Sequence, residues 1–89
     1  MGYRVEFAPR AEREFKKLTR PVQVRLKTRI DALAEENPRP KGVERLSGEE
    51  PLYRIRGGDY RVIYAIGDEV LLVLVVRVGH RRDVYRGVA

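Results

Sequence analysis

The longest apolar run of the chain, VLLVLVV at 70–76, places the strongest constraint on its fold. An apolar run between a Gly-Asp-Glu turn and Gly79 predicts a strand over Val70–Val78. Because no polar residue interrupts the run, we expect this strand to lie inside a sheet with both of its faces covered. The run is much shorter than the roughly 18–20 apolar residues that cross a membrane, so we expect no membrane segment.

Two segments before this run alternate apolar and polar residues. Leu52–Arg56 and Tyr60–Ile66 both show the period of two that is typical of a half-buried strand. Gly57-Gly58-Asp59 separates the two segments, and Gly67-Asp68-Glu69 separates the second from the apolar run. Together the three segments predict an antiparallel meander.

The N-terminal half predicts a strand followed by a helical hairpin. Tyr3–Phe7 alternates, and beyond Pro9 and Pro21 apolar residues recur every three or four positions, as in amphipathic helices. Those positions are Ala11, Phe15 and Leu18, then Val22, Leu26, Ile30 and Leu33. Prolines end the second helix, and residues 43–51 are expected to form a loop. The order β-α-α-β-β-β predicts one α+β domain over residues 1–89, its helical hairpin packed on one face of a mostly antiparallel sheet.

Composition excludes several classes of protein. The chain has no cysteine, which excludes disulfides and thiolate chemistry, and its single histidine, His80, argues against a metal site built from histidines. The N-terminal MGYRVEF lacks the apolar core of a signal peptide, so we expect a cytoplasmic protein. A formal net charge of +6 predicts an anionic partner, either a nucleic acid or an acidic protein.

Three arginines fall on one face of the predicted meander. Arg54 and Arg56 alternate with the apolar residues of their strand, and Arg61 alternates with those of the next strand. If the apolar residues face the helices, the three guanidinium groups share the opposite face and form an anion site of phosphate size. Charged side chains are also common at exposed strand positions, where they discourage edge pairing.

The segment VGHRRDVYR, directly after the apolar strand, adds titratable groups. Cleavage of RNA through its own 2′-hydroxyl needs a base, an acid for the departing 5′-oxygen and positive charge around the phosphate. His80 is a residue type that exchanges protons near neutral pH, whereas Tyr85 needs a neighbouring positive charge to do so. A histidine at a strand end is also commonly a plain surface residue, and Tyr85 is equally suited to packing its ring. These residues alone predict a basic α+β domain that binds nucleic acid.

Four segments, taken together, resemble one known family. They are FAPRAEREFKKL, ENPRPKGVERLSG, YRIRGGDYRVIYAI and VGHRRDVYR, and they occur in the family's order and spacing. Through them, nearly the whole chain resembles the RelE/ParE superfamily of toxins from type II toxin–antitoxin systems, with RelE-type members the most similar. The resemblance implies a RelE-like fold, which agrees with the predicted element order.

RelE-type toxins cleave messenger RNA in the decoding site of the ribosome, so the resemblance implies an endoribonuclease, or mRNA interferase. Carried over motif by motif, the family's phosphate-binding basic pair falls on Arg54 and Arg56. The resemblance further implies that Arg61 stabilises the phosphate, that Tyr85 takes the 2′-hydroxyl proton and that Arg81 assists the leaving oxygen.

Two of these assignments stay open. Arg82 is an alternative to Arg81 and also a phosphate-binding candidate, because the segment before Tyr85 is shorter than in some members of the family. His80 is an alternative to Tyr85 for the acid–base work.

The same resemblance implies the partners. We expect a cognate acidic antitoxin and messenger RNA on the ribosome, with contacts to ribosomal RNA, and neither a small-molecule substrate nor a cofactor, since attack by the 2′-hydroxyl needs none. One alternative is a ParE-like inhibitor of DNA gyrase, which shares the fold without cutting RNA. Another is a non-catalytic basic module, such as a toxin-derived co-repressor.

Overall fold

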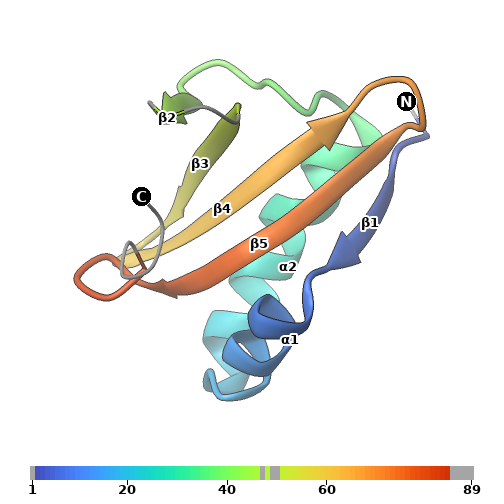
Figure 1. Cartoon of the computed structure of the whole chain (residues 1–89). Helices are drawn as coiled ribbons and strands as arrows, with labels where there is room; N and C mark the ends of the chain where they lie inside the picture. Colours follow the sequence, from blue (N-terminus) through green and yellow to red (C-terminus); the bar gives the residue numbers. More distant parts are fainter. Residues whose placement is uncertain (1, 47, 49–50, 85–89) are drawn as a thin grey trace.

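A computed structural model describes residues 2–46, 48 and 51–84 of the chain (Figure 1). It contains two helices and five strands in the order β1 (Arg4–Phe7), α1 (Pro9–Lys16), α2 (Arg20–Glu35), β2 (Glu44–Leu46), β3 (Leu52–Gly57), β4 (Tyr60–Gly67) and β5 (Leu72–His80). Pro9 opens α1 in place of a side-chain cap, as is common at the first helical position.

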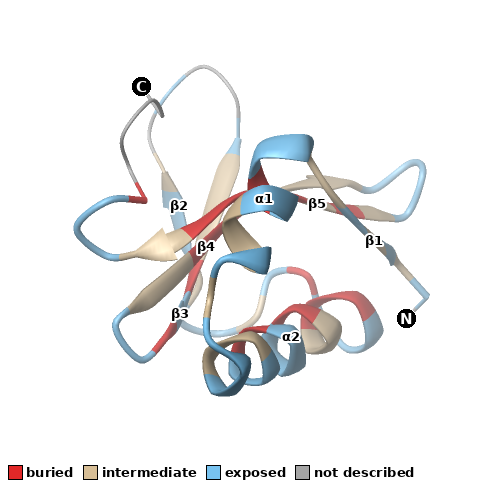
Figure 2. Ribbon diagram, turned by 90° about the horizontal axis from the view of Figure 1, so that it is seen from below, coloured by how far each residue is buried: buried red, intermediate tan, exposed pale blue. Residues whose placement is uncertain are grey.

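The five strands form one sheet in the order β1-β5-β4-β3-β2. The hairpins β2–β3, β3–β4 and β4–β5 are antiparallel, whereas β1 pairs with β5 in parallel. The parallel pair needs a crossover, and the two helices of that crossover cover one face of the sheet (Figures 1 and 2). The predicted α+β fold, with a helical hairpin on a mostly antiparallel sheet, is confirmed.

Two details differ from the sequence prediction. Glu44–Leu46 lies in the expected loop but pairs with β3, because a strand edge leaves backbone N–H and C=O groups that a short neighbouring segment can satisfy. β5 does lie inside the sheet, between β1 and β4. However, its residues alternate between buried and half-buried, so its second face is only partly covered.

The core lies between the sheet and the helical hairpin. Its fully buried members include Leu26, Ile30, Val62, Tyr64 and Val73. The Tyr64 hydroxyl donates a hydrogen bond of 2.7 Å to the carbonyl of Pro38, which ties the segment after α2 to β4. Burial raises the pKa of Tyr64 above its ordinary value.

An acidic side chain of α1 holds the far end of β5. β1 ends at Phe7, so the outer edge of β5 beyond Val75 pairs with no strand among the residues that the structure describes. There the Glu14 carboxylate accepts the backbone N–H of Val78 at 2.9 Å and the Nε–H of Arg77 at 3.0 and 3.2 Å. This carboxylate therefore fixes the strand end that leads into residues 81–84.

No helix in the described part of the chain is long and apolar enough to cross a membrane.

Candidate functional site

The strand register brings three arginines together on the face of the sheet that the helices leave uncovered. Arg56 is the direct cross-strand partner of Arg61, and Arg54 is the partner of Ile63. Directly paired residues point to the same face, while the alternate residues of both strands, Ile55 and Val62 among them, belong to the core. Arg54, Arg56 and Arg61, the arginine cluster, thus share one face.

The β3–β4 turn orients the guanidinium group of Arg61. Its Nη1 donates hydrogen bonds of 3.0 Å to the carbonyls of Gly58 and Tyr60. A guanidinium group has five N–H donors, so these bonds hold it in place and leave Nε and Nη2 for an anion. Gly58 has a φ of 65°, which glycine adopts at no steric cost in a two-residue hairpin turn.

Residues 81–84 fold back toward this turn. The backbone N–H of Arg81 donates a hydrogen bond of 2.8 Å to the carbonyl of Asp59, in the β3–β4 turn. The N–H groups of Asp83 and Val84 bond to the carbonyl of His80, and the buried Val84 packs over Gly79. Because Gly79 is the cross-strand partner of Arg61, the segment with Arg81 lies beside the arginine cluster.

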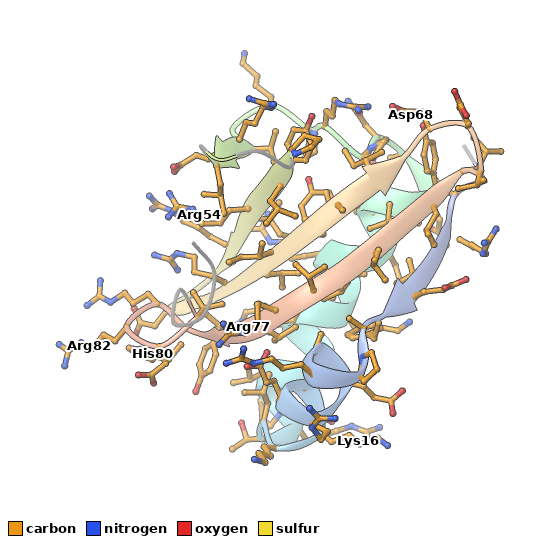
Figure 3. The ribbon with its side chains drawn as sticks, in the orientation of Figure 1. Lys16, Arg54, Asp68, Arg77, His80 and Arg82 are labelled. Atoms are coloured by element: carbon orange, nitrogen blue, oxygen red, sulfur yellow. The ribbon has the colours of Figure 1, made fainter. Side chains whose placement is uncertain are left out.

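The structure separates His80 from the arginine cluster. His80 is the cross-strand partner of Tyr60, and their rings meet edge to face at 5.7 Å. Both residues therefore project to the face opposite Arg61. The His80 Nδ1 atom accepts the N–H of Arg82 at 3.2 Å, so the neutral ring carries its proton on Nε2. Figure 3 shows His80, the last residue of β5, and Arg82 at the same tip of the sheet. Tyr85, the other acid–base candidate, lies outside the described residues.

A carboxylate that the sequence analysis missed lies within the cluster. Glu44 of β2 is the cross-strand partner of Arg54 and forms an ion pair with its guanidinium group. The hydrogen bond and the charge of Arg54, with smaller effects of Arg56 and Arg61, hold the pKa of Glu44 below its ordinary value. A strand as short as Glu44–Leu46 has no readable periodicity, and the single acid in VERL, Glu44, was the only signal.

These residues place three guanidinium groups and one carboxylate on the same part of the sheet. Two or more guanidinium groups can bind the non-bridging oxygens of a phosphate, and the Glu44 carboxylate is an anion already paired with one of them, Arg54. Within residues 2–46, 48 and 51–84, no group of three His, Asp or Glu side chains is arranged to hold a metal ion. The arrangement suits phosphate chemistry carried out by arginine and proton-transferring side chains.

Comparison with known proteins shows which family this chain resembles. Residues 5–85 match the family described as the ParE toxin of the type II toxin–antitoxin system parDE. The chain is 35% identical over 83 residues to the mRNA interferase toxin RelE of Escherichia coli K12, a match that covers 91% of this chain and 85% of that protein.

Solved structures show the same fold. The isolated E. coli RelE toxin superposes with a TM-score of 0.78 at 32% identity, over 89% of this chain and 84% of the other. An archaeal RelE–RelB complex from Pyrococcus horikoshii OT3 matches over the full length of both chains, with a TM-score of 0.76 and 30% identity. The chain belongs to the RelE/ParE family of toxins of type II toxin–antitoxin systems.

Proposed function

We propose that this toxin is an mRNA interferase of RelE type, which cuts messenger RNA in the decoding site of the ribosome. The observation that carries the proposal is the direct pairing of Arg56 with Arg61, with Arg54 on the same face. The similarity to a relative named mRNA interferase toxin RelE supports it.

In the proposed reaction, the 2′-hydroxyl of one nucleotide attacks the phosphate that follows it. Arg54, Arg56 and Arg61 bind the phosphate and stabilise the charge that redistributes over its oxygens. Arg81 assists the departing 5′-oxygen, with Arg82 as the alternative. No metal or cofactor takes part in this scheme.

The 2′-hydroxyl proton needs an acceptor. Tyr85 is the acceptor that the family resemblance implies. Glu44 is a second one by its position against Arg54, but its lowered pKa makes its carboxylate a weak base. His80 is the weaker candidate, since its register turns it toward the opposite face. Substitutions of Tyr85, Glu44 and His80, measured under single-turnover conditions, would rank the three.

We further propose that a cognate antitoxin inhibits the toxin by covering the arginine cluster. Relatives of this chain were solved as RelE–RelB toxin–antitoxin complexes. A net charge of +6 favours an acidic partner, and an acidic side chain of that partner can bind the arginines as a phosphate does.

The proposal is tested by adding the purified protein to a defined messenger RNA with and without ribosomes, and by mapping breaks through primer extension. We expect breaks in the decoding site only when ribosomes are present, and a loss of about 2–3 orders of magnitude in rate for Arg61→Ala, comparable to the removal of a transition-state donor. Arg13→Ala, which removes the same charge from the exposed surface of α1, is the matched control. If Arg61→Ala cuts at the wild-type rate, the site assignment is wrong.

A second candidate function is inhibition of DNA gyrase, because the family matched over residues 5–85 is described as a ParE toxin. A supercoiling assay with purified gyrase separates the two functions. Inhibition of gyrase by a folded protein that leaves ribosome-bound RNA intact would replace the proposed function.

A further inference from the structure

Two arginines of α2, Arg25 and Arg29, lie on the flank of the helix next to β3. The Cδ atom of Arg25 lies 3.8 Å from the position that a Cβ would take on Gly57, and its Nη1 atom lies 2.8 Å from that position on Gly58. Arg29, one helical turn later, lines a small pocket between α2 and β3 together with Ile55. The Arg25 side chain therefore runs from the helix across the β3–β4 turn.

Gly57 and Gly58 make this close approach possible. A side chain on Gly58 would displace the guanidinium group of Arg25, and one on Gly57 would overlap Leu26 at 2.5 Å. From the other side, Arg61 donates to the carbonyl of Gly58 at 3.0 Å. Two guanidinium groups, one from the helix and one from the sheet, thus meet at the same glycine.

Arg25 and Arg29 do not contribute an ion pair to the stability of α2. In the part of the chain that the structure describes, no carboxylate lies within 4 Å of either guanidinium group, whereas Lys27 of the same helix pairs with Asp31 at 3.0 Å. Like charges four residues apart also destabilise a helix by a few tenths of a kcal/mol. Both arginines are exposed, which leaves their donors to an anion from outside the chain.

We propose that Arg25 and Arg29 bind backbone phosphates of a single-stranded RNA that passes from the arginine cluster over the Gly57–Asp59 turn onto α2. The inference rests on the proposed function, because the cluster would hold the scissile phosphate of the same strand. The path bends from one face of the sheet to a helix flank over a two-residue turn. A single strand follows such a bend at low cost, whereas a stiff duplex does not.

The test measures binding without cleavage. A fluorescent single-stranded RNA with 2′-O-methyl groups lacks the attacking hydroxyl, and its affinity is measured by anisotropy over a series of salt concentrations. The slope of log K against log salt is negative, and its magnitude decreases by about 0.7 for each phosphate of a single strand that the protein no longer neutralises. We expect this decrease for Arg25→Ala, a similar one for Arg29→Ala, and the wild-type slope for Arg25→Lys.

Arg13→Ala is the matched control, because it removes one exposed helical arginine at a site away from the β3–β4 turn, on α1. The urea midpoint of each variant checks that it is folded. A smaller slope for Arg25→Ala than for Arg13→Ala supports the proposal, whether or not the protein cuts messenger RNA on ribosomes. Equal slopes for these two variants overturn the proposal. It is also overturned if Arg25→Ala weakens the binding of an acidic peptide but leaves the binding of RNA unchanged. Arg61→Ala reports separately on the cleavage site.

Discussion

Replacement of Glu14 by alanine should strongly destabilise the fold, although Glu14 lies on a short surface helix. Its carboxylate accepts the Arg77 guanidinium and the backbone N–H of Val78. The Arg77 side chain is only 7% exposed, and that of Glu14 is 22% exposed. The substitution therefore removes the α1 carboxylate that faces the buried guanidinium group of Arg77, and it removes the acceptor of the Val78 backbone N–H at the edge of β5.

The magnitude follows from these two effects. Breaking a buried ion pair by removing one partner costs about 3–5 kcal/mol. We expect a value near the lower end, about 3 kcal/mol, because Glu14 is partly exposed and Arg77 also donates to the carbonyl of Asp83 at 3.4 Å. Glu14→Gln keeps an acceptor for Val78, so it should be less damaging by about 1 kcal/mol, the net value of one hydrogen bond.

The assay is urea unfolding followed by circular dichroism, with thermal melting as a second probe. A loss of about 3 kcal/mol should lower the Tm by about 12–24 °C in a domain of this size, at about 4–8 °C per kcal/mol. Glu12→Ala is the matched control, because its ion pair with Lys16 is 60% and 73% exposed and should contribute less than about 1 kcal/mol. If Glu14→Ala is no more destabilising than Glu12→Ala, the assigned role of the carboxylate at the end of β5 is refuted.

Three further predictions concern other parts of the structure. Glu44→Gln should tighten the binding of 2′-O-methyl RNA, because a carboxylate no longer competes with phosphate for the arginines; unchanged affinity would show that no such competition exists. Asp68 has its pKa lowered to about 2 by hydrogen bonds from Arg39 and Tyr3. Its contribution to stability should be complete above the unfolded pKa near 4 and should be lost as the pH falls toward about 2. Asp68→Asn should flatten that part of the pH–stability curve, and an identical curve would contradict this. Gly57→Ala should cost about 1–3 kcal/mol in urea unfolding, because the new Cβ overlaps the fully buried Leu26; a neutral effect would mean that α2 can shift.

The helices and the meander could be predicted because their periodicities are long and undisturbed. Leu26, Ile30 and Leu33 repeat at helical spacing and are all buried, and the turns at Gly57-Gly58-Asp59 and Gly67-Asp68-Glu69 end strands as expected. β2 could not be predicted, because three residues carry no period and its pairing depends on the edge of a strand that follows later in the chain.

The face shared by Arg54, Arg56 and Arg61 could be predicted from alternation alone, since strand parity determines the direction of each side chain. The face to which His80 points could not be predicted from alternation, although His80 belongs to the same strand as Val75 and Arg77. A bulge in the register between Ile63 and Tyr64 makes Val75 and Val78, three residues apart, both core residues. The bulge shifts the parity of the strand end and turns His80 to the face opposite the arginines. Nothing in VLVVRVGH marks its position.

The Gly57–Asp59 turn orders part of the arginine site through backbone carbonyls. Arg61 is held by the Gly58 carbonyl, and the segment with Arg81 is held by the Asp59 carbonyl. An arginine side chain carries roughly 2 kcal/mol of rotamer entropy, which is lost when it becomes fixed on a ligand. Backbone carbonyls can fix a guanidinium before the ligand arrives without neutralising it, whereas an ion pair fixes it at the expense of its charge. A turn that offers a carbonyl to Arg61 therefore favours a site that is both ordered and still positive when an anion binds.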